Sequence, residues 1–325
     1  MNYSFKRRTF VAGLAAAAAV PGAWSQPAWP SRPIQLVHGF GAGGNADVIA
    51  RLVAQHLGEQ LGQSVVVDIK SGAGGMLASS HVAKSAPDGH TLVLLTGAHT
   101  ASAAMRASLP YDPVKDFSFI STVTAFPFAV CVRAEHPAKT LADLIKIART
   151  GSDKVSFTSV GVGSTQHLTG ELLGGAAGVQ LLHVPYRGGG APVQSVLAGE
   201  VDLLCDTLTV SLPHIQSGRL RALAVTSATP WPSLPNVPPA AVTLPGFEVK
   251  SWLGVAGPAG LPPEIVQRLH AELGTLLQNP QVQRTVANAG SATAHITPQA
   301  MRDMVQSDIA RWRDVIARRG IQIQS

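Results

Sequence analysis

A glycine-rich segment, Gly39-Phe40-Gly41-Ala42-Gly43-Gly44, is the motif with the most specific chemistry in this sequence. It fits the pattern G-x-G-x-x-G, in which glycines bring the backbone close to a pyrophosphate at a helix N-terminus. An apolar run precedes it and a helical pattern follows it. Asp68 lies at the end of the next apolar run, where dinucleotide enzymes place a ribose-binding acid. Taken alone, the segment therefore permits a dinucleotide-dependent oxidoreductase.

The same arrangement of glycines recurs along the chain, which a single cofactor fingerprint does not explain. Residues 71–75 follow the second apolar run, and residues 161–163 and 188–190 follow two later ones. Lys70 also lies beside Asp68, which complicates a ribose pocket. Glycine turns at strand ends leave backbone N–H groups pointing outward at helix N-termini, where they bind anions. Several such turns favour an anion-binding cleft over a dinucleotide site.

Motifs for nucleophilic or metal-dependent catalysis are missing from the sequence. It contains neither G-x-S-x-G nor H-E-x-x-H. Among the 11 histidines, His38, His99, His167 and His183 fall near predicted strand ends, but they lack the spacing of a closed metal site. The sequence therefore predicts no catalytic residue, no metal and no cofactor. It leaves open whether one or two of these histidines line a cleft.

Apolar runs and helical patterns alternate in both halves of the chain, with glycine turns between them. The predicted strands span residues 34–37, 65–69, 91–95, 155–159, 181–184, 201–204, 220–225 and 252–256. The predicted helices span residues 47–58, 76–86, 141–149, 165–173, 191–197, 264–277 and 298–319, with Thr140 and Thr297 as N-caps. Between the halves, residues 119–133 form a β-rich stretch that Pro127 interrupts. This order predicts an α/β fold of two lobes, each a mostly parallel sheet flanked by helices.

The N-terminus has the composition of a cleavable export signal. Lys6-Arg7-Arg8 precedes an apolar run over residues 10–20, and Ala23-Trp24-Ser25 offers small residues for cleavage before Gln26. A run of about 11 residues is too short for a membrane span, which needs roughly 20. Arg-Arg-Thr-Phe-Val fits a twin-arginine signal, and a Sec signal remains open. We expect residues 1–25 to be removed and the mature protein to be periplasmic, and export is also compatible with the oxidoreductase hypothesis.

Composition excludes one class of partner and leaves the state of the cysteines open. Without the three leader charges, 22 basic residues remain against 19 acidic ones, a net charge of +3. The absence of a basic run and an aromatic content of only 5% argue against nucleic-acid binding. Cys131 and Cys205 are the only cysteines. Export permits a disulfide between them, but cysteines in so apolar a chain are more often buried and free.

Nine short motifs, in order along nearly the whole mature chain, resemble the Bug family of periplasmic binding proteins, the receptors of tripartite tricarboxylate transporters. In the first half they are Trp29-Pro30-Ser31-Arg32-Pro33-Ile34, Gly43-Gly44-Asn45-Ala46-Asp47, Ser71-Gly72-Ala73-Gly74-Gly75, Ala86-Pro87-Asp88-Gly89-His90-Thr91-Leu92 and Leu109-Pro110-Tyr111-Asp112-Pro113-Val114-Lys115-Asp116-Phe117. In the second half they are Gly163-Ser164-Thr165-Gln166-His167-Leu168, His183-Val184-Pro185-Tyr186-Arg187-Gly188, Gly199-Glu200-Val201-Asp202-Leu203 and Leu220-Arg221-Ala222-Leu223-Ala224-Val225-Thr226.

The resemblance implies a Venus-flytrap fold. Lobe 1 would comprise residues 26–126 and 227–325, with the C-terminal helix near the lobe boundary, and lobe 2 residues 127–226. It also implies a monomeric receptor that holds a small carboxylate between the lobes and passes it to membrane transporter subunits. The ligand-binding residues expected by position are Gly39, Phe40, Gly41, Ala42, Gly43, Asn45, Asp47, Ser71, Gly72, Ala73, Gly74, Thr96, Ser164, Thr165, Tyr186 and Asp206.

These side chains suit different roles in such a cleft. The hydroxyls of Ser164 and Thr165, at a helix start, can hold a carboxylate together with backbone N–H groups. Asp206 suits acceptance of a hydrogen bond from a ligand amine, a hydroxyl or a bridging water, and equally a capping role. Tyr186 suits either a ligand contact or packing at the hinge.

The first loop departs from the family pattern, which leaves the identity of the ligand open. Where many Bug relatives have prolines, this chain has His38-Gly39-Phe40-Gly41-Ala42. Because proline has no N–H, glycines here leave more donors free. Organic acids, amino acids and aromatic carboxylates all suit such a clamp. A ligand sensor or adaptor for signalling would share these features, so the sequence does not separate that role from transport.

Overall fold

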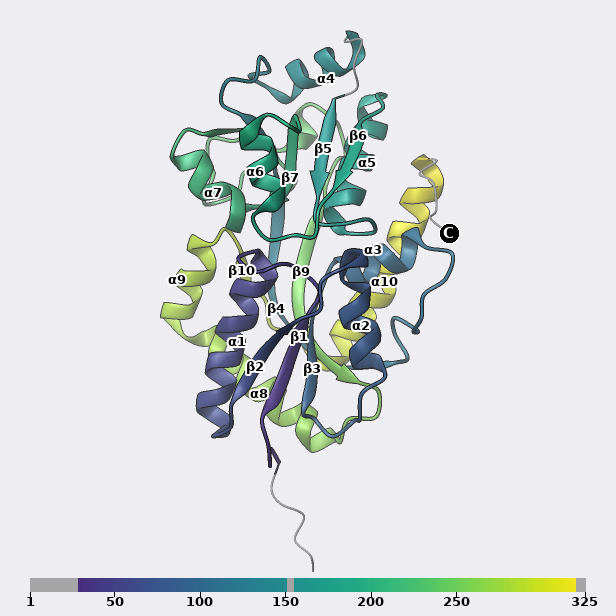
Figure 1. The fold of residues 1–325 in the computed structure, drawn as a ribbon, viewed down its shortest axis with the longest axis vertical. Coiled ribbons are helices and arrows are strands. Elements are labelled where there is room, and N and C mark those ends of the chain that lie inside the picture. The colour runs from purple at the N-terminus through teal and green to yellow at the C-terminus, as the bar shows by residue number, and fades with distance from the viewer. Residues whose placement is uncertain (1–28, 151–154, 320–325) are drawn as a thin grey trace, which may run out of the picture.

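Two lobes lie one above the other in the computed structural model, which describes residues 29–150 and 155–319 (Figure 1). Within these ranges a sheet of ten strands runs through both lobes in the order β2-β1-β3-β9-β4-β7-β5-β6, and β8 and β10 also pair with β4. Helices flank the sheet in both lobes. The predicted two-lobed α/β fold is confirmed.

Lobe 1 is the lower lobe in Figure 1. Its own strands are β1 (Ile34–His38), β2 (Val65–Ile69), β3 (Thr91–Thr96), β9 (Lys250–Pro258) and β10 (Ala292–Thr293). Its helices are α1 (Asn45–Leu61), the short η1 (Ala73–Gly75), α2 (Met76–Ala83), α3 (Ala98–Met105), α8 (Pro263–Gln278), α9 (Pro280–Asn288) and α10 (Pro298–Arg319). Parallel pairing joins β1 to β2 and β3, whereas β9 is antiparallel to β3.

Lobe 2 is the upper lobe. Its own strands are β5 (Ser156–Ser159), β6 (Leu182–Pro185), β7 (Leu203–Thr207) and β8 (Leu220–Val225). Its helices are α4 (Leu141–Thr150), α5 (Thr165–Ala177), α6 (Ala191–Ala198) and α7 (Leu208–Gln216), and the short η2 (Ala240–Val242) lies on the return toward β9. Parallel pairing joins β5 to β6 and β7. Parallel strands thus lie toward the outside of each lobe, and antiparallel pairs surround the central strand.

That central strand, β4 (Phe117–Arg133), passes from lobe 1 into lobe 2 without a break. It pairs with β9 as far as Pro127 and with β7 from Phe128 onward. The predicted interruption at Pro127 is therefore wrong. Proline has no N–H to donate, but it lies where β4 changes partners, and the next N–H, that of Phe128, donates to Thr226 Oγ1 (2.8 Å). The predicted domain boundaries near residues 126 and 226 remain a prediction.

Other elements differ from the predicted ones for local reasons. Helices α3, α7 and α9 were not predicted; all eight residues of α3 are buried, so its sequence has no amphipathic period. Strand β7 runs from Leu203 to Thr207, whereas the predicted strand spanned residues 201–204. Before Leu203, the Asp202 side chain accepts the Ser156 N–H (2.8 Å), so this N–H of β5 does not bond to a neighbouring strand. The predicted N-caps are confirmed, since Thr140 Oγ1 accepts the Asp143 N–H and Thr297 Oγ1 accepts the Ala300 N–H.

The two cysteines are buried and not bonded to each other. Although β4 and β7 are neighbours, Cys131 pairs in register with Leu204, and Cys205 with Val130. This offset of one residue directs their side chains to opposite faces of the sheet, into different hydrophobic clusters. Burial raises the pKa of both thiols. They therefore behave as core residues.

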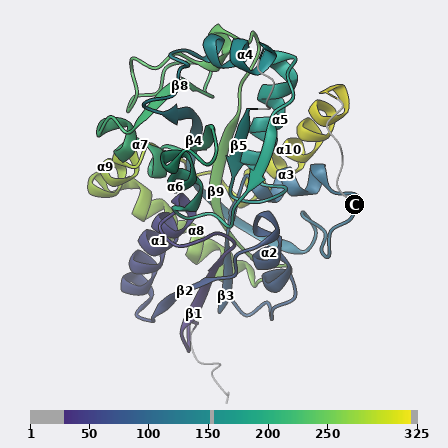
Figure 2. The ribbon, with the colours of Figure 1, turned by 45° about the horizontal axis from the view of Figure 1, so that its top comes forward.

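The C-terminal helix α10 runs beside α3 toward lobe 2, as both ribbon views show (Figures 1 and 2). Trp312 on α10 and Leu172 on α5 line one cavity on that side of the molecule, so α10 reaches the second lobe. The predicted export signal, residues 1–25, lies outside the described residues. In the part of the chain that the structure does describe, no helix combines the length and the apolar character needed to cross a membrane.

Candidate ligand-binding cleft

A cavity of about 450 Å³, counting its open mouth, lies between the lobes at the carboxyl ends of their parallel strands. Open α/β sheets bind ligands at this edge. Lobe 1 and the crossing strands line it with Phe40, Gly44, Asn45, Ala46, Thr96, Phe126, Ser251 and Leu253. Lobe 2 lines it with Phe128, Val160, Thr165, Gln166, Gly189, Asp206, Thr207 and Val210. This cavity is called the cleft below.

Three helices begin at the wall of the cleft. Asn45 is the first residue of α1, Thr165 is the first of α5, and Thr207 is the N-cap of α7. The first turn of a helix has unpaired N–H groups and the positive end of the helix dipole. Among the described lining residues there is no Lys, Arg or His. Any anion in the cleft would therefore be held by backbone N–H groups and neutral side chains.

Three buried polar atoms in the cleft wall lack a hydrogen-bond partner among the described residues, namely Asn45 Nδ2, Thr165 Oγ1 and Thr207 Oγ1. The orientation of the Asn45 amide is fixed from lobe 2, because Thr209 Oγ1 donates to Asn45 Oδ1 (2.8 Å). This leaves the NH₂ group free as a donor. A buried donor without a partner destabilises a protein by about 1–3 kcal/mol, so such atoms mark where a ligand is expected to bind.

The first loop, residues 39–44, is held by a charged group just behind it. Asp47 Oδ2 accepts the Gly43 N–H (2.9 Å), and Arg51 approaches the other oxygen, with Nη2 3.0 Å from Oδ1. His38 Nε2 lies 3.4 Å from Asp47 Oδ1, and His38 Nδ1 accepts the Phe40 N–H (3.4 Å). His38 and Asp47 therefore position the loop backbone.

The pKa values in this group follow from its contacts. Burial would raise the pKa of Asp47, but hydrogen bonds from Arg51 and the Gly43 N–H bring that pKa below its ordinary value. Burial lowers the pKa of His38, although Asp47 opposes that effect. At neutral pH the loop is thus held by an ionised carboxylate and a neutral imidazole.

Hydrogen bonds between the lobes show that the structure is a closed form. The Gly41 N–H donates to the Arg187 carbonyl (3.2 Å), and Ser102 Oγ donates to the Gly163 carbonyl (2.9 Å). The backbone of Gly74 also packs against the opposite lobe, because a Cβ added there would lie 2.7 Å from the Val162 carbonyl oxygen. The second loop, residues 71–75, therefore touches lobe 2 directly.

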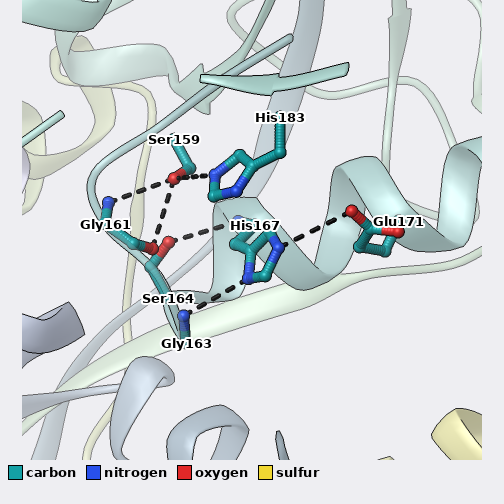
Figure 3. A network of polar contacts seen from close by, with 7 residues as sticks. All are labelled: Ser159, Gly161, Gly163, Ser164, His167, Glu171 and His183. Carbon is teal, nitrogen blue, oxygen red and sulfur yellow. Dashed lines mark hydrogen bonds and ion pairs between the residues drawn. The ribbon is translucent and has the colours of Figure 1, made fainter. Parts of the chain in front are cut away.

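A network of polar contacts holds the facing loop of lobe 2, residues 159–164 (Figure 3). The rings of His167 and His183 stack with their centroids 3.9 Å apart. His167 Nδ1 accepts the Gly163 N–H (3.3 Å), and Ser159 Oγ lies 2.6 Å from His183 Nε2. Burial lowers the pKa of His183 to about 4, and His167 adds to the effect. The imidazole of His183 is therefore neutral at physiological pH.

Asp206 is the ionisable residue in the cleft wall, and only 3% of it is exposed. Its Oδ1 accepts hydrogen bonds from Gln166 Nε2 (3.1 Å) and from the Thr207 N–H (2.7 Å). Burial raises the pKa of Asp206 to about 6, although Gln166 and the N–H and side chain of Thr207 oppose the rise. Near neutral pH it can thus serve as a hydrogen-bond acceptor, with a readily accessible protonated form.

The predicted site residues fall into three groups. Phe40, Asn45, Thr96, Thr165 and Asp206 line the cleft. Gly39 and Gly74 line a smaller cavity that adjoins it at Phe40 and Thr96. The rest, Gly41, Ala42, Gly43, Asp47, Ser71, Gly72, Ala73, Ser164 and Tyr186, line neither cavity.

Some members of the last group still shape the cleft. Ser164 is the N-cap of α5, with its Oγ accepting the His167 N–H (3.2 Å). The Tyr186 side chain packs against a hydrophobic cluster of lobe 2, as the packing alternative for this residue suggested. Ligand contacts for the whole predicted set remain a prediction.

Sequence reasoning missed the floor and part of the wall of the cleft. Phe126 and Phe128 of β4 and Leu253 of β9 line it, but in the sequence they look like ordinary strand residues. Gln166 was also missed, although it directly follows the predicted Thr165. Over the described ranges, no group of three His, Cys, Asp or Glu residues could hold a metal ion.

Comparison with known proteins identifies the family. A model of the TctC family, described as "Tripartite tricarboxylate transporter family receptor", matches residues 49–321. The chain belongs to this family. The resemblance to Bug proteins is confirmed as well, because the structure of the periplasmic binding protein BugD matches with a TM-score of 0.87 at 32% identity, covering 91% of this chain and 100% of BugD.

Two other TctC relatives extend the comparison. The UPF0065 protein in the tcbD-tcbE intergenic region of Pseudomonas sp. strain P51 is 38% identical over 314 residues, covering 95% of this chain and 94% of the relative. The structure of Rpa4515 from R. palustris with adipate matches with a TM-score of 0.87 at 36% identity, covering 90% of this chain and 99% of that one. Among these neighbours, BugD is described as a periplasmic binding protein.

Proposed function

We propose that this protein is a monomeric periplasmic receptor that closes on a small carboxylate and delivers it to the membrane subunits of a tripartite tricarboxylate transporter. The observation that supports this most directly is the convergence of three helix N-termini on one interlobe cleft without a cationic side chain in its described wall. Such a cleft stabilises a small anion through oriented N–H groups. The adipate-bound TctC neighbour supports a carboxylate as that anion.

The dinucleotide alternative fits the first loop less well. The Gly41 N–H, which a pyrophosphate would need, donates to the Arg187 carbonyl of lobe 2. Asp68, the candidate ribose-binding acid, pairs with Lys70 at 3.1 Å. The loop therefore contributes to lobe closure, as a receptor requires.

Calorimetric titration of the mature protein with short-chain monocarboxylates and adipate tests ligand binding. A ligand at 100 times its Kd stabilises the folded form by about 2.7 kcal/mol, so binding should also raise the melting temperature in a concentration-dependent way. Thr165→Val removes a free hydroxyl from the cleft wall and should weaken binding about tenfold, a typical loss for one hydrogen bond to a charged group.

Thr169→Val is the matched control. Thr169 lies on the same helix, is also buried, and directs its hydroxyl to the Thr165 carbonyl (2.7 Å), away from the ligand. Binding should therefore be retained in this variant. If ligand-free protein binds none of these acids, the carboxylate receptor is wrong. If it binds them while deletion of its gene leaves their uptake unchanged but alters transcription, signalling replaces transport.

A further inference from the structure

We propose that the ligand is a monocarboxylate with an apolar body and a hydrogen-bond donor, a hydroxyl or an ammonium group, that binds Asp206. A second carboxylate at that end should bind more weakly, because Asp206 would have to take up a proton first. This inference rests on the proposed function and names the substrate class of the same cleft. It also separates this receptor from its adipate-bound neighbour, whose ligand has two carboxylates.

The hydrogen bonds of Asp206 leave one of its oxygens available. Both protein donors, Gln166 Nε2 and the Thr207 N–H, reach Oδ1. No hydrogen bond from a described residue reaches Oδ2, although Asp206 as a whole is 97% buried and lines the cleft. A carboxylate oxygen in such a position is a strong acceptor that lacks a donor. The ligand is the group that can supply one.

No cationic side chain among the described residues pairs with Asp206 Oδ2. Among the described ion pairs none includes Asp206, and the lining residues contain no Lys, Arg or His. The neighbouring groups that can ionise are the buried thiols of Cys131 and Cys205, which are neutral. A ligand ammonium or hydroxyl would satisfy Oδ2. A second carboxylate would instead place two like charges together in a buried site, or require Asp206 to bind a proton.

The remaining wall of the cleft is largely apolar and suits the apolar body of the ligand. Phe126 and Phe128 lie edge to face with centroids 6.0 Å apart, and Leu253 and Val210 complete that side of the cleft. None of these side chains offers a donor to a second carboxylate. The donors without a partner are Asn45 Nδ2 and Thr165 Oγ1, which lie at the starts of α1 and α5 and suit a single carboxylate, and Thr207 Oγ1, which belongs to the residue after Asp206.

Four acids of equal chain length test the proposal by calorimetry at pH 8: hexanoate, 6-hydroxyhexanoate, 6-aminohexanoate and adipate. Benzoate, 3-hydroxybenzoate, 3-(aminomethyl)benzoate and isophthalate form a second matched series for a rigid body. In the series that fits the cleft, at least one donor-bearing acid should bind ten times more tightly than the acid without a donor. The dicarboxylate should bind most weakly. The hydroxyl and ammonium members show which donor Asp206 selects.

Asp206→Asn should reduce the preference for the donor-bearing acid over the dicarboxylate to less than threefold. Asp202→Asn is the control, because Asp202 is in the same lobe but bonds to Ser156 outside the cleft. It should keep the wild-type preference.

The proposal is overturned if the wild-type protein binds the dicarboxylate as tightly as the donor-bearing acids. The wild-type series decides this even if a variant does not fold. A folded Asp206→Asn protein that keeps the full preference also overturns it. Failure of every acid in both series would instead contradict the proposed function itself.

Discussion

Each lobe buries one aspartate at or beside the cleft, and the protein shifts the pKa values of these two carboxyl groups in opposite directions. Asp47 on α1 and Asp206 on β7 are 4% and 3% exposed. Asp47 Oδ2 accepts hydrogen bonds from the Gly43 N–H and Arg51 Nε, Asp47 Oδ1 lies 3.0 Å from Arg51 Nη2 in an ion pair, and the pKa of Asp47 is lowered. The hydrogen bonds of Asp206 come from neutral groups and reach one oxygen, and its pKa is raised to about 6.

This difference separates a positioning role from a ligand-facing one. A buried charge whose partners are all in the protein fixes the backbone around it, as Asp47 does for Gly43. A buried charge without a cationic partner destabilises the empty protein and becomes favourable once a ligand provides a donor. Lobe 1 thus supplies a preformed anion site, whereas lobe 2 supplies a group that is incomplete until the cleft is filled.

The largest effect is expected from removing the charge of Asp47. Asp47→Asn should lower the free energy of unfolding by about 3 kcal/mol, because a buried carboxylate then loses its charge-assisted hydrogen bonds from the Gly43 N–H and Arg51 and no longer supports the first loop. Urea unfolding at pH 7.5 measures this. Arg51→Gln should lower it by less than about 1 kcal/mol, because the Arg51 side chain is 61% exposed. Equal effects of the two variants would show that Asp47 has no special positioning role.

The opposite sign is expected at Asp206. Asp206→Asn should raise the free energy of unfolding of the ligand-free protein by about 2 kcal/mol at pH 8. The pKa of Asp206 rises from 3.8 to about 6 on folding, and each pH unit of difference corresponds to about 1.4 kcal/mol. The amide hydrogen bonds that replace those of the carboxylate are weaker, which reduces the gain.

The sign of this effect makes it depend on pH. A carboxyl whose pKa is raised by folding contributes stability at low pH, and that contribution is lost as pH rises through about 6. The gain from Asp206→Asn should therefore shrink toward zero near pH 4. Unfolding curves at pH 8 and pH 4 test both points. A variant less stable than wild type at pH 8 would mean that the ligand-free protein already satisfies the charge.

A change at the contact between lobes tests whether closure matters for binding. Gly74→Ala should weaken ligand binding about tenfold, because its Cβ would lie 2.7 Å from the Val162 carbonyl oxygen in the closed form. Gly62→Ala is a close control. Gly62 has nearly the same backbone angles (φ 64°, ψ 21° against φ 65°, ψ 25°), but nothing lies within 4 Å of its Cβ position.

Both glycine variants should lose similar stability, about 1 kcal/mol, from the left-handed conformation. Only Gly74→Ala should lose affinity in calorimetry. Equal affinities would show that this contact does not belong to the ligand-bound form.

Local rules in the sequence were enough for the parts of the cleft made by loops and helix starts. The glycines at 39–44 predicted a turn, and Thr165 followed from its place after a strand. Both lie at or beside the cleft. The expectation of free N–H groups in this turn was wrong for Phe40, Gly41 and Gly43, whose N–H groups donate to His38, Arg187 and Asp47. The two-lobed fold followed from repeated strand–turn–helix units, because that order leaves few arrangements of a parallel sheet.

The floor of the cleft did not follow from the sequence, because it depends on which strands become neighbours. Phe126, Phe128 and Leu253 lie far apart or on a single long strand, and only the pairing of β4 with β9 brings them together. The all-buried helix α3 lacks the amphipathic period that sequence reasoning uses. The free oxygen of Asp206 depends on the orientation of Gln166, which no pattern encodes.

The smallest effect is expected from the histidines behind the two walls. His38 lies 3.4 Å from Asp47, whereas His183 lies beside another imidazole, and its pKa is lowered to about 4. A histidine whose pKa is lowered by folding contributes stability above its ordinary pKa of 6.5, and that contribution is lost as pH falls toward 4. Because His183 is only partly buried, we expect a loss of about 1 kcal/mol between pH 7 and pH 4.5.

In His183→Gln, the free energy of unfolding should therefore fall by about 1 kcal/mol less than in the wild type between pH 7 and pH 4.5. His81→Gln, at an exposed histidine on α2, should leave the curve unchanged. His99, whose pKa burial also lowers to about 4, is present in both variants and contributes equally. Combining His183→Gln with Asp206→Asn should change the acid slope less than His183→Gln alone, because the two residues of lobe 2 act with opposite sign, while the other histidines with a lowered pKa are still present. An unchanged acid slope in His183→Gln would assign the loss to other histidines whose pKa burial lowers, such as His38 and His136.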